Sequence, residues 1–202
     1  MIKNYIFDYG KVIVDFDEEY MSSVYTKNPN DIEILKEIVF DRFYWDKLDS
    51  GTITDSEVIA GVTKRLPEHL RETGIKVYEN WYYNNPQIEG TAELIKSLKA
   101  KGAKIFLLSN ISRGFAKNYK TIPQTGELLS SFDGLVFSSL LGITKPDKRI
   151  FEYLLNKYNL NADETMFIDD REKNVAGANS VGIKGYLFDG DVEKLKKEIE
   201  KQ

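Results

Sequence analysis

Polar residues whose side chains can take part in chemistry follow short apolar segments of this chain. The segments are rich in Ile, Leu, Phe and Val, which is typical of buried strands. The polar groups are Asp8, Ser109-Asn110, Lys145-Pro146-Asp147 and Asp169-Asp170. If the segments are parallel strands, these groups meet at the carboxyl edge of one sheet, where open α/β sheets bind ligands. The pattern therefore predicts one polar site assembled from distant parts of the chain.

Carboxylates dominate the predicted site, because Asp8, Asp169 and Asp170 all belong to it. Placed together, they would repel one another and raise each other's pKa unless a cation held them. Oxygen ligands without imidazole or thiolate partners favour Mg²⁺ over Zn²⁺. We therefore expect a magnesium site.

The other polar groups suit a phosphate. Lys145 offers positive charge, and Ser109 and Asn110 offer a hydroxyl and an amide as hydrogen-bond donors. Taken singly, each polar residue also has a structural interpretation as a helix cap, a turn residue or a solvated loop residue. The hypothesis of a functional site depends on their occurring together.

The elements that must position these residues alternate between strands and helices. Strands are predicted at residues 5–7, 105–108, 135–137, 166–168 and 186–188. Helices are predicted at residues 91–101, with Thr91 as N-cap and Gly102 as stop, and after Pro146. Residues 192–202 carry alternating charges and are predicted to form a solvated terminal helix. The alternation predicts an α/β fold, with a Rossmann-like parallel sheet covered by helices on both faces.

The segment between the first and second predicted strands is far longer than one crossover helix requires. Its apolar residues repeat at helical spacing over residues 32–43, 56–66 and 70–83. We therefore expect a small all-helical unit at residues 16–86, inserted after the first strand. The core domain would then comprise residues 1–15 and 87–202.

The composition of the 202-residue chain excludes several classes of protein. Hydrophobic residues make up 42%, enough for one main core. The net charge of −4 and the mixed signs provide no basic surface for nucleic acid, and no apolar run is long enough for a membrane span. The absence of cysteine excludes disulfides and thiolate chemistry, and it suits a reducing compartment, so a cytoplasmic location is expected. The sequence gives no indication of the oligomeric state.

The motifs resemble a known family. The strings FDYGKVIVDFD, LLSN, KPD and FIDDREKNV are similar, in sequence and order, to the four motifs of the haloacid dehalogenase superfamily. The resemblance extends over essentially the whole chain. The helical insert is similar to the cap of subfamily I, and the first motif is similar to that of α-glucose-1-phosphate phosphatase-like members.

This resemblance implies a Mg²⁺-dependent phosphatase of small phosphorylated metabolites such as sugar phosphates. Asp8 matches the nucleophile, which becomes an aspartyl-phosphate. Asp8, the backbone carbonyl of Gly10 and Asp170 match the metal ligands. Lys145 matches the cation that orients Asp8 and offsets charge in the transition state.

The resemblance also assigns supporting roles. Ser109 matches the residue that binds the transferring phosphoryl group, and Asn110 would contribute a further contact. Asp169 and Asn174 would orient the metal ligands or act through water. Asn174 lies four residues after Asp170, so one helical turn can return it to the site.

Gly10 departs from the family pattern, because most of the superfamily's phosphatases carry a second aspartate there as general acid and base. Three hypotheses follow: a phosphatase with another proton donor, a 2-haloacid dehalogenase-type hydrolase, or a catalytically weak protein that binds phosphorylated ligands. Asp15 and Asp17 are candidates for the missing group, although both also suit a hinge or helix-cap role.

Aromatic residues cluster in the insert as Phe43-Tyr44-Trp45 and Trp81-Tyr82-Tyr83. They are expected to pack inside the helical unit. Because adjacent residues of a helix cannot all face inward, one or two side chains of each cluster should face the crevice or solvent. His69, the single histidine, is expected at the surface.

Overall fold

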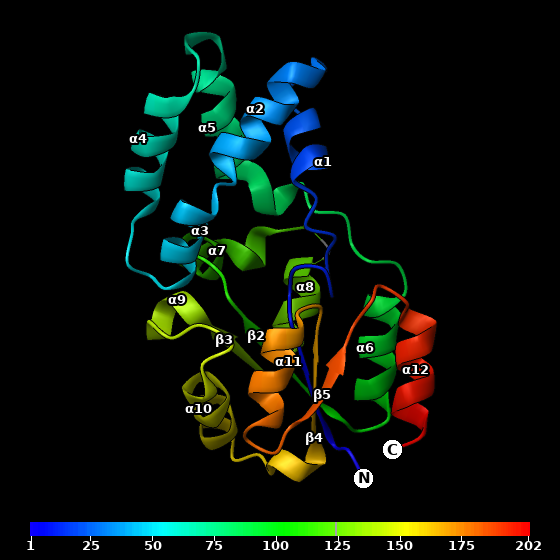
Figure 1. Ribbon diagram of the computed structural model, residues 1–202. Helices are drawn as coiled ribbons and strands as arrows, with labels where there is room; N and C mark the ends of the chain where they lie inside the picture. The colour runs from blue at the N-terminus through cyan, green and yellow to red at the C-terminus, as the bar shows by residue number, and fades with distance from the viewer. Residues whose placement is uncertain (124) are drawn as a thin grey trace.

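A computed structural model describes residues 1–123 and 125–202 of the chain. Its centre is one parallel sheet with strand order β3-β2-β1-β4-β5. The strands are β1 (Asn4–Phe7), β2 (Lys104–Ser109), β3 (Gly134–Phe137), β4 (Thr165–Asp169) and β5 (Lys184–Leu187). The predicted α/β fold is confirmed (Figure 1).

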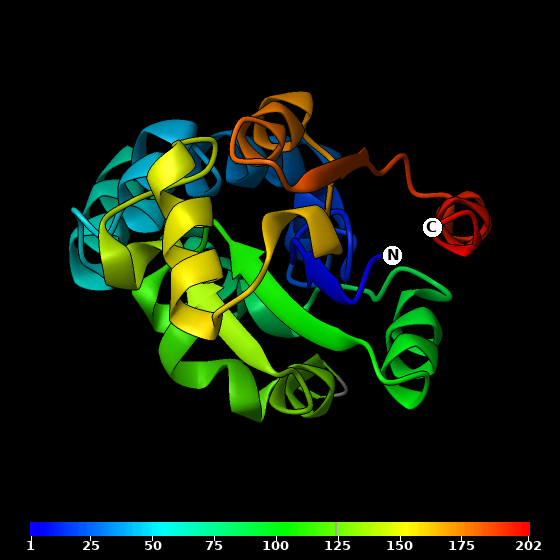
Figure 2. The ribbon, with the colours of Figure 1, turned by 90° about the horizontal axis from the view of Figure 1, so that it is seen from below.

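Side chains of successive strand residues enter two separate cores. On β1, Tyr5 and Phe7 belong to one core and Ile6 to the other, as the two-residue repeat of a strand requires. The first core receives helices α6 (Thr91–Ala100), α8 (Thr125–Ser130) and α12 (Val192–Glu200). The second receives α10 (Lys148–Tyr158) and α11 (Glu172–Asn179). Helices therefore cover both faces of the sheet (Figure 2).

The ends of two core helices differ from the predictions. Thr91 does not cap α6, because Gly90 occupies the N-cap position with a φ of 82° and Thr91 is the first helical residue. A left-handed backbone at this position suits glycine, which has no Cβ to clash. The terminal helix α12 is not wholly solvated, since Val192 and Leu195 are buried against the first core.

Beyond the carboxyl ends of the strands lies a second layer, which we call the cap and define as helices α1 to α5 (Figure 1). These are α1 (Glu18–Ser23), α2 (Pro29–Val39), α3 (Arg42–Asp49), α4 (Asp55–Arg65) and α5 (Arg71–Asn80). The single helix predicted at residues 32–43 is wrong: α2 ends at Val39, and the Asp41 side chain caps α3 by accepting from Phe43 N.

Two neighbouring segments connect the cap to the sheet. Asp15 N donates to Pro86 O at 2.7 Å, and Ile88 N donates to Ile13 O at 3.0 Å. Val14 and Gln87 form an antiparallel bridge between them. The outgoing and returning chains therefore pair at the boundary of the two layers. Within the described ranges, no helix has the length and apolar character needed to cross a membrane.

Candidate active site

Most of the polar groups singled out in the sequence converge where β1 and β4 end. Asp147 does not, because its side chain caps α10 and pairs with Arg149. Asp8 directly follows β1, and its amide donates to Ile168 O of β4 at 3.0 Å. Asp169 is the last residue of β4, so the parallel register brings these two carboxylates to the same edge. Both are buried, with 8% of Asp8 and none of Asp169 exposed.

Lys145 connects these carboxylates. Its Nζ lies 2.9 Å from Asp8 Oδ1 and 2.7 Å from Asp169 Oδ2. Asn110 holds the Lys145 backbone from both directions: its Nδ2 donates to Lys145 O at 3.0 Å, and Lys145 N donates to its Oδ1 at 2.8 Å. The Asn110 side chain therefore positions the lysine, whereas the sequence suggested only a contact to the phosphoryl group.

Asp169 is saturated by further donors. Asn174 Nδ2 lies 3.0 Å from both of its oxygens, and Arg171 N donates to Oδ1 at 2.8 Å. Asn174 reaches the site from the first turn of α11. A carboxylate with this many donors acts as an anchor for Lys145. The expected role of Asp169 in orienting the metal ligands stays a prediction.

The charges of the site depend on one another. Burial raises the pKa of Asp8, whereas the Lys145 ammonium opposes the increase. Burial alone would lower the pKa of Lys145, but Asp8 and Asp169 reverse that effect and leave it above its usual value. Burial and the neighbouring Asp169 also raise the pKa of Asp170, because each additional negative charge here is costly.

The acidic residues have the composition and spacing of a divalent-cation site. One carboxylate oxygen from each of Asp8, Asp169 and Asp170 lies within 4.8 Å of the others. Lys145 neutralises only part of this charge, and the all-oxygen donor set fits Mg²⁺. Since Asp169 is engaged by Lys145 and Asn174, Asp8 and Asp170 are the carboxylates with capacity for an ion.

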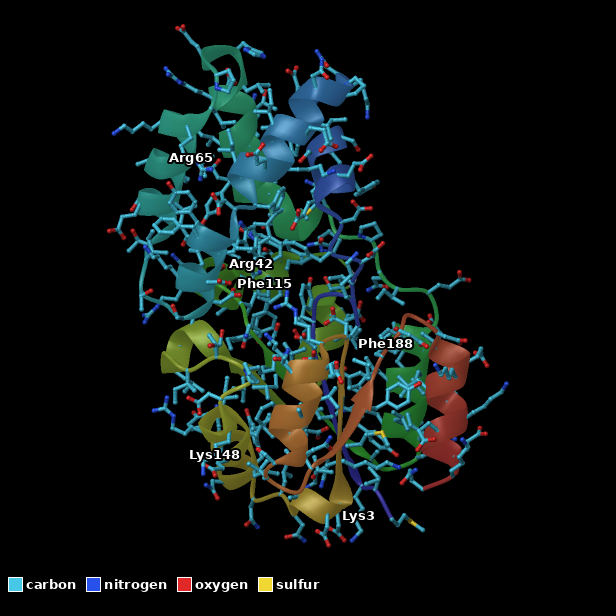
Figure 3. The ribbon with its side chains drawn as sticks, in the orientation of Figure 1. Lys3, Arg42, Arg65, Phe115, Lys148 and Phe188 are labelled. Atoms are coloured by element: carbon cyan, nitrogen blue, oxygen red, sulfur yellow. The ribbon has the colours of Figure 1, made fainter. Side chains whose placement is uncertain are left out.

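A cavity of about 180 Å³ opens over these groups, and the cap forms one of its walls. Its wall includes Ser109 and Gly10 from the core. The cap and the connections contribute residues that the sequence analysis missed as site residues: Glu18, Arg42, Asp49 and Arg171. Arg42 lies on the side of the cap that faces the core (Figure 3). Arg171 lies inside the quoted motif FIDDREKNV, but it was not singled out there. The cap residues had no such signal, because Asp49 stands in a turn-like Asp-Ser-Gly string and Glu18 and Arg42 stand in charged segments.

Aromatic packing forms the apolar wall of this cavity. Trp45 and Trp81 are buried, their ring centroids lie 5.1 Å apart, and both line the cavity together with Phe16. Phe43 is 59% exposed and lies under Lys47. One member of each aromatic cluster therefore faces the crevice.

The proton-transfer candidates from the first motif lie elsewhere. Asp15 is half exposed and pairs with Lys11 at 2.5 Å. Asp17 caps α1 by accepting from Tyr20 N at 2.9 Å. Neither residue lines the cavity over Asp8. His69 is exposed, as expected, and lies 3.2 Å from Asp31.

Known proteins resemble this chain, some over most of its length and others over about half of it. A family model described as haloacid dehalogenase-like hydrolase matches residues 2–182. A D-ribitol-5-phosphate phosphatase of Bacteroides thetaiotaomicron is 25% identical over 191 residues, which cover 92% of this chain and 91% of that protein. A sesquiterpene phosphatase of Aspergillus oryzae is 33% identical over 92 residues, and the match spans only 45% of its length.

Solved structures share the fold. A haloacid dehalogenase family enzyme of Bacteroides thetaiotaomicron, in complex with magnesium and inorganic phosphate, superimposes with a TM-score of 0.71 at 23% identity, covering 96% of this chain and 99% of that one. An L-2-haloacid dehalogenase of Xanthobacter autotrophicus gives 0.65 at 16% identity, covering 92% and 76%. Together with the convergent strand-end residues, the match over residues 2–182 shows that this chain belongs to the haloacid dehalogenase-like hydrolase family.

Proposed function

We propose that the chain is a Mg²⁺-dependent phosphatase of small phosphorylated metabolites, in which Asp8 forms an aspartyl-phosphate. The observation that carries the proposal is the buried Asp8–Lys145–Asp169 arrangement at the floor of a cap-covered cavity. Lys145 offsets the negative charge of Asp8 and Asp169, and this reduces the repulsion that a dianionic phosphate meets as it approaches the Asp8 carboxylate. The phosphatases among the relatives support the same chemistry.

The residues of this chain divide the reaction between them. An oxygen of Asp8 attacks phosphorus, and water later hydrolyses the aspartyl-phosphate, so that one difficult displacement becomes two easier ones. Lys145 holds Asp8 in position and offsets negative charge on the transferring group. Ser109 lines the cavity and offers its hydroxyl to a phosphoryl oxygen.

A bound Mg²⁺ would supply Lewis-acid stabilisation of phosphoryl charge. Asp8 and Asp170, with the backbone carbonyl of Gly10, would hold the ion. Asp169 would remain with Lys145 and Asn174, and would keep the lysine aimed at the floor of the cavity.

The substrate class follows from the shape and charge of the cavity. About 180 Å³ suits a small substrate. Arg42 and Arg171 offer charged donors to a polar leaving group, and Trp45 and Trp81 offer flat apolar faces. A phosphorylated sugar or polyol fits both the donors and the aromatic faces.

The decisive assay measures phosphate release from a panel of sugar and polyol phosphates, with and without Mg²⁺. We expect release that requires both the ion and Asp8. Release that survives Asp8→Asn or complete removal of Mg²⁺ would contradict the mechanism. A parallel chloride-release assay on 2-haloacids tests the dehalogenase alternative, and phosphate binding without turnover would identify a binding protein.

A further inference from the structure

Gly10 leaves one step of the proposed reaction without a proton donor. An alkoxide leaving group needs a proton as its bond to phosphorus breaks, and the attacking water must later lose one. Glycine has no side chain that can exchange protons. Asp15 and Asp17, the nearby acids in sequence, are engaged with Lys11 and with the N-terminus of α1. The missing group must therefore come from another part of the cavity wall.

Asp49 is placed to supply it. It is the last residue of α3, it is only 8% exposed, and it lines the same cavity as Asp8. It belongs to the cap, whereas Asp8 lies at the end of a core strand, so the two acids line different walls of the cavity. The cap is the side on which the leaving group of a phosphate bound over Asp8 would lie.

The backbone of Asp49 is anchored to the core. Ser138 Oγ donates to Asp49 O at 2.6 Å, and the same hydroxyl accepts from Ile111 N at 3.0 Å. Ile111 lies two residues after Ser109, so one hydroxyl links the end of α3 to the loop after β2. Gly51 completes the contact, because its backbone has a φ of 68° and an added Cβ would lie 2.4 Å from Ser139 O. The hydrogen bonds of Ser138 and the close approach of Gly51 thus fix the position of the Asp49 backbone relative to the core.

The environment of the Asp49 side chain favours a carboxylic acid. Within the described part of the chain its carboxyl group has no hydrogen-bond partner, which leaves it available to a substrate. Burial raises its pKa to about 7, although Arg42, Arg171 and Lys145 lower it and Asp46 raises it. The end of the α3 dipole also disfavours a negative charge at this position. An acid that titrates near neutrality is suited to giving and taking a proton.

Within the proposed function, we propose that Asp49 of the cap is the general acid and base that replaces the side chain missing at Gly10. In the first step an Asp8 oxygen bonds to phosphorus, the bond to the leaving oxygen breaks, and the Asp49 proton passes to that oxygen. In the second step water attacks phosphorus, gives one proton to the Asp49 carboxylate, and displaces Asp8. Phosphate leaves, and both residues return to their initial states.

Glu18 is the rival acid in this cavity. It lines the wall, and burial raises its pKa, but it is less enclosed than Asp49 and it stands in the first turn of α1, near Lys36 and Arg42. A carboxylate at a helix N-terminus is stabilised by the dipole, which opposes the proton-donor role. Glu18 therefore suits contact with the leaving group better than proton transfer.

The test compares leaving groups. Asp49→Asn should lower kcat for alkyl phosphates by ~10²- to 10⁴-fold, the usual effect of losing a general acid and base. Its first-turnover release of nitrophenolate from p-nitrophenyl phosphate should stay close to wild type, because this anion leaves without a proton. The aspartyl-phosphate should then accumulate as a product burst. Asp163→Asn is the control: Asp163 is exposed in the core layer, it does not line the cavity, and the variant should keep the wild-type dependence on the leaving group.

A rescue makes the test specific. A Cβ at Gly10 would meet only Phe16 Cβ, at 3.7 Å, so the site has space for a side chain. Gly10→Asp should restore part of the alkyl phosphatase activity to Asp49→Asn, whereas Gly10→Ala should not.

Equal losses for alkyl and aryl phosphates in Asp49→Asn, with no burst, would overturn the assignment and make Asp49 a substrate-binding residue. A selective loss on alkyl phosphates in Glu18→Gln, with nitrophenolate release retained and Asp49→Asn unaffected, would transfer the role to Glu18. Failure of the proposed function gives a different result, namely a folded wild-type protein that releases phosphate from neither class of substrate.

Discussion

The two sides of the cavity differ in how their charged groups are held. On the core side, Lys145 contacts Asp8 and Asp169, and Asp169 also accepts from Asn174 and Arg171 N. On the cap side, Asp49 is buried without a partner for its carboxyl group among the described residues, and only its backbone is fixed. On the core side Asp8 and Asp169 are paired with a lysine, whereas on the cap side the Asp49 carboxyl is held only through its backbone and is left free to react.

In the proposed function, this contrast corresponds to the two ends of a phosphate ester. The phosphoryl group is the same in every substrate, so its side can be organised in advance by fully paired side chains. The leaving group varies and must exchange a proton, so its side keeps groups whose protonation can change. The helices of the cap would contact the variable leaving group, and the residues at the strand ends would contact the constant phosphoryl group.

The largest expected effect is at Asp8, the proposed nucleophile. Asp8→Asn should lower kcat on the order of 10⁴- to 10⁶-fold, since removing a covalent nucleophile abolishes both displacements. Rapid-quench trapping of a phosphoenzyme is the measurement: it should label wild type and fail in the variant. A phosphoenzyme in Asp8→Asn would show that another residue is the nucleophile.

Lys145 should matter for stability as well as activity. Lys145→Met leaves Asp8 and Asp169 buried without their cation, which should lower the free energy of unfolding by about 3–5 kcal/mol. Lys148→Met removes an exposed lysine that faces Glu152 at 3.8 Å and should cost about 0–1 kcal/mol. Urea unfolding without Mg²⁺ measures both. Similar losses in the free energy of unfolding for the two variants would show that the buried pairing of Lys145 with Asp8 and Asp169 contributes no more than an exposed ion pair.

The titration of Asp49 should affect stability. Its pKa is about 7 in the folded chain against an ordinary 3.8, so between these values the folded chain binds a proton that the unfolded chain has lost. Stability should therefore fall as pH rises from about 4 to about 7, by on the order of 4 kcal/mol from this residue. The difference between wild type and Asp49→Asn, followed by urea unfolding across that range, isolates the effect. A pH-independent difference would mean that Asp49 is ionised throughout.

Ser138 tests whether the backbone of Asp49 needs its anchor. Ser138→Ala removes hydrogen bonds to Asp49 O and Ile111 N, and should cost about 1–3 kcal/mol in stability because both groups stay buried. Turnover of alkyl phosphates should fall further than first-turnover release of nitrophenolate. Ser180→Ala, which loses one exposed bond within a helix end, serves as the control. A loss of stability without any change in leaving-group dependence would separate the anchor from the chemistry.

The smallest effects are expected at the acids of the first motif. Asp15→Asn breaks an exposed pair with Lys11, which is worth about 0–1 kcal/mol, and should leave kcat near the wild-type value. Steady-state assays on an alkyl phosphate provide the measurement. A loss of 10²-fold or more would reinstate Asp15 as the proton donor and remove that role from the cap.

The strand-end groups were accessible from the sequence because parallel strands impose a simple rule. Apolar runs mark the strands, and the residues at their carboxyl ends must share one edge of the sheet. The sequence therefore predicted a single site that contains Asp8, Ser109, Lys145 and Asp169. Two helix boundaries were predicted wrongly because another residue takes the N-cap position. Gly90 caps α6 instead of Thr91, and Asp41 starts a new helix within residues 32–43.

The cap side depended on contacts that no local pattern encodes. Asp49 and Ser138 are 89 positions apart and meet only because α3 packs against α9 (Ser138–Leu141). Likewise, nothing in the sequence indicates that the Asn110 side chain forms two hydrogen bonds with the Lys145 backbone and so positions the lysine. The sequence by itself determined the parallel sheet and the polar groups at its edge, because periodicity and chain order are local properties. Tertiary packing alone decided which acids are buried and which are paired, because burial and neighbouring charge set a pKa and both depend on segments remote in the chain.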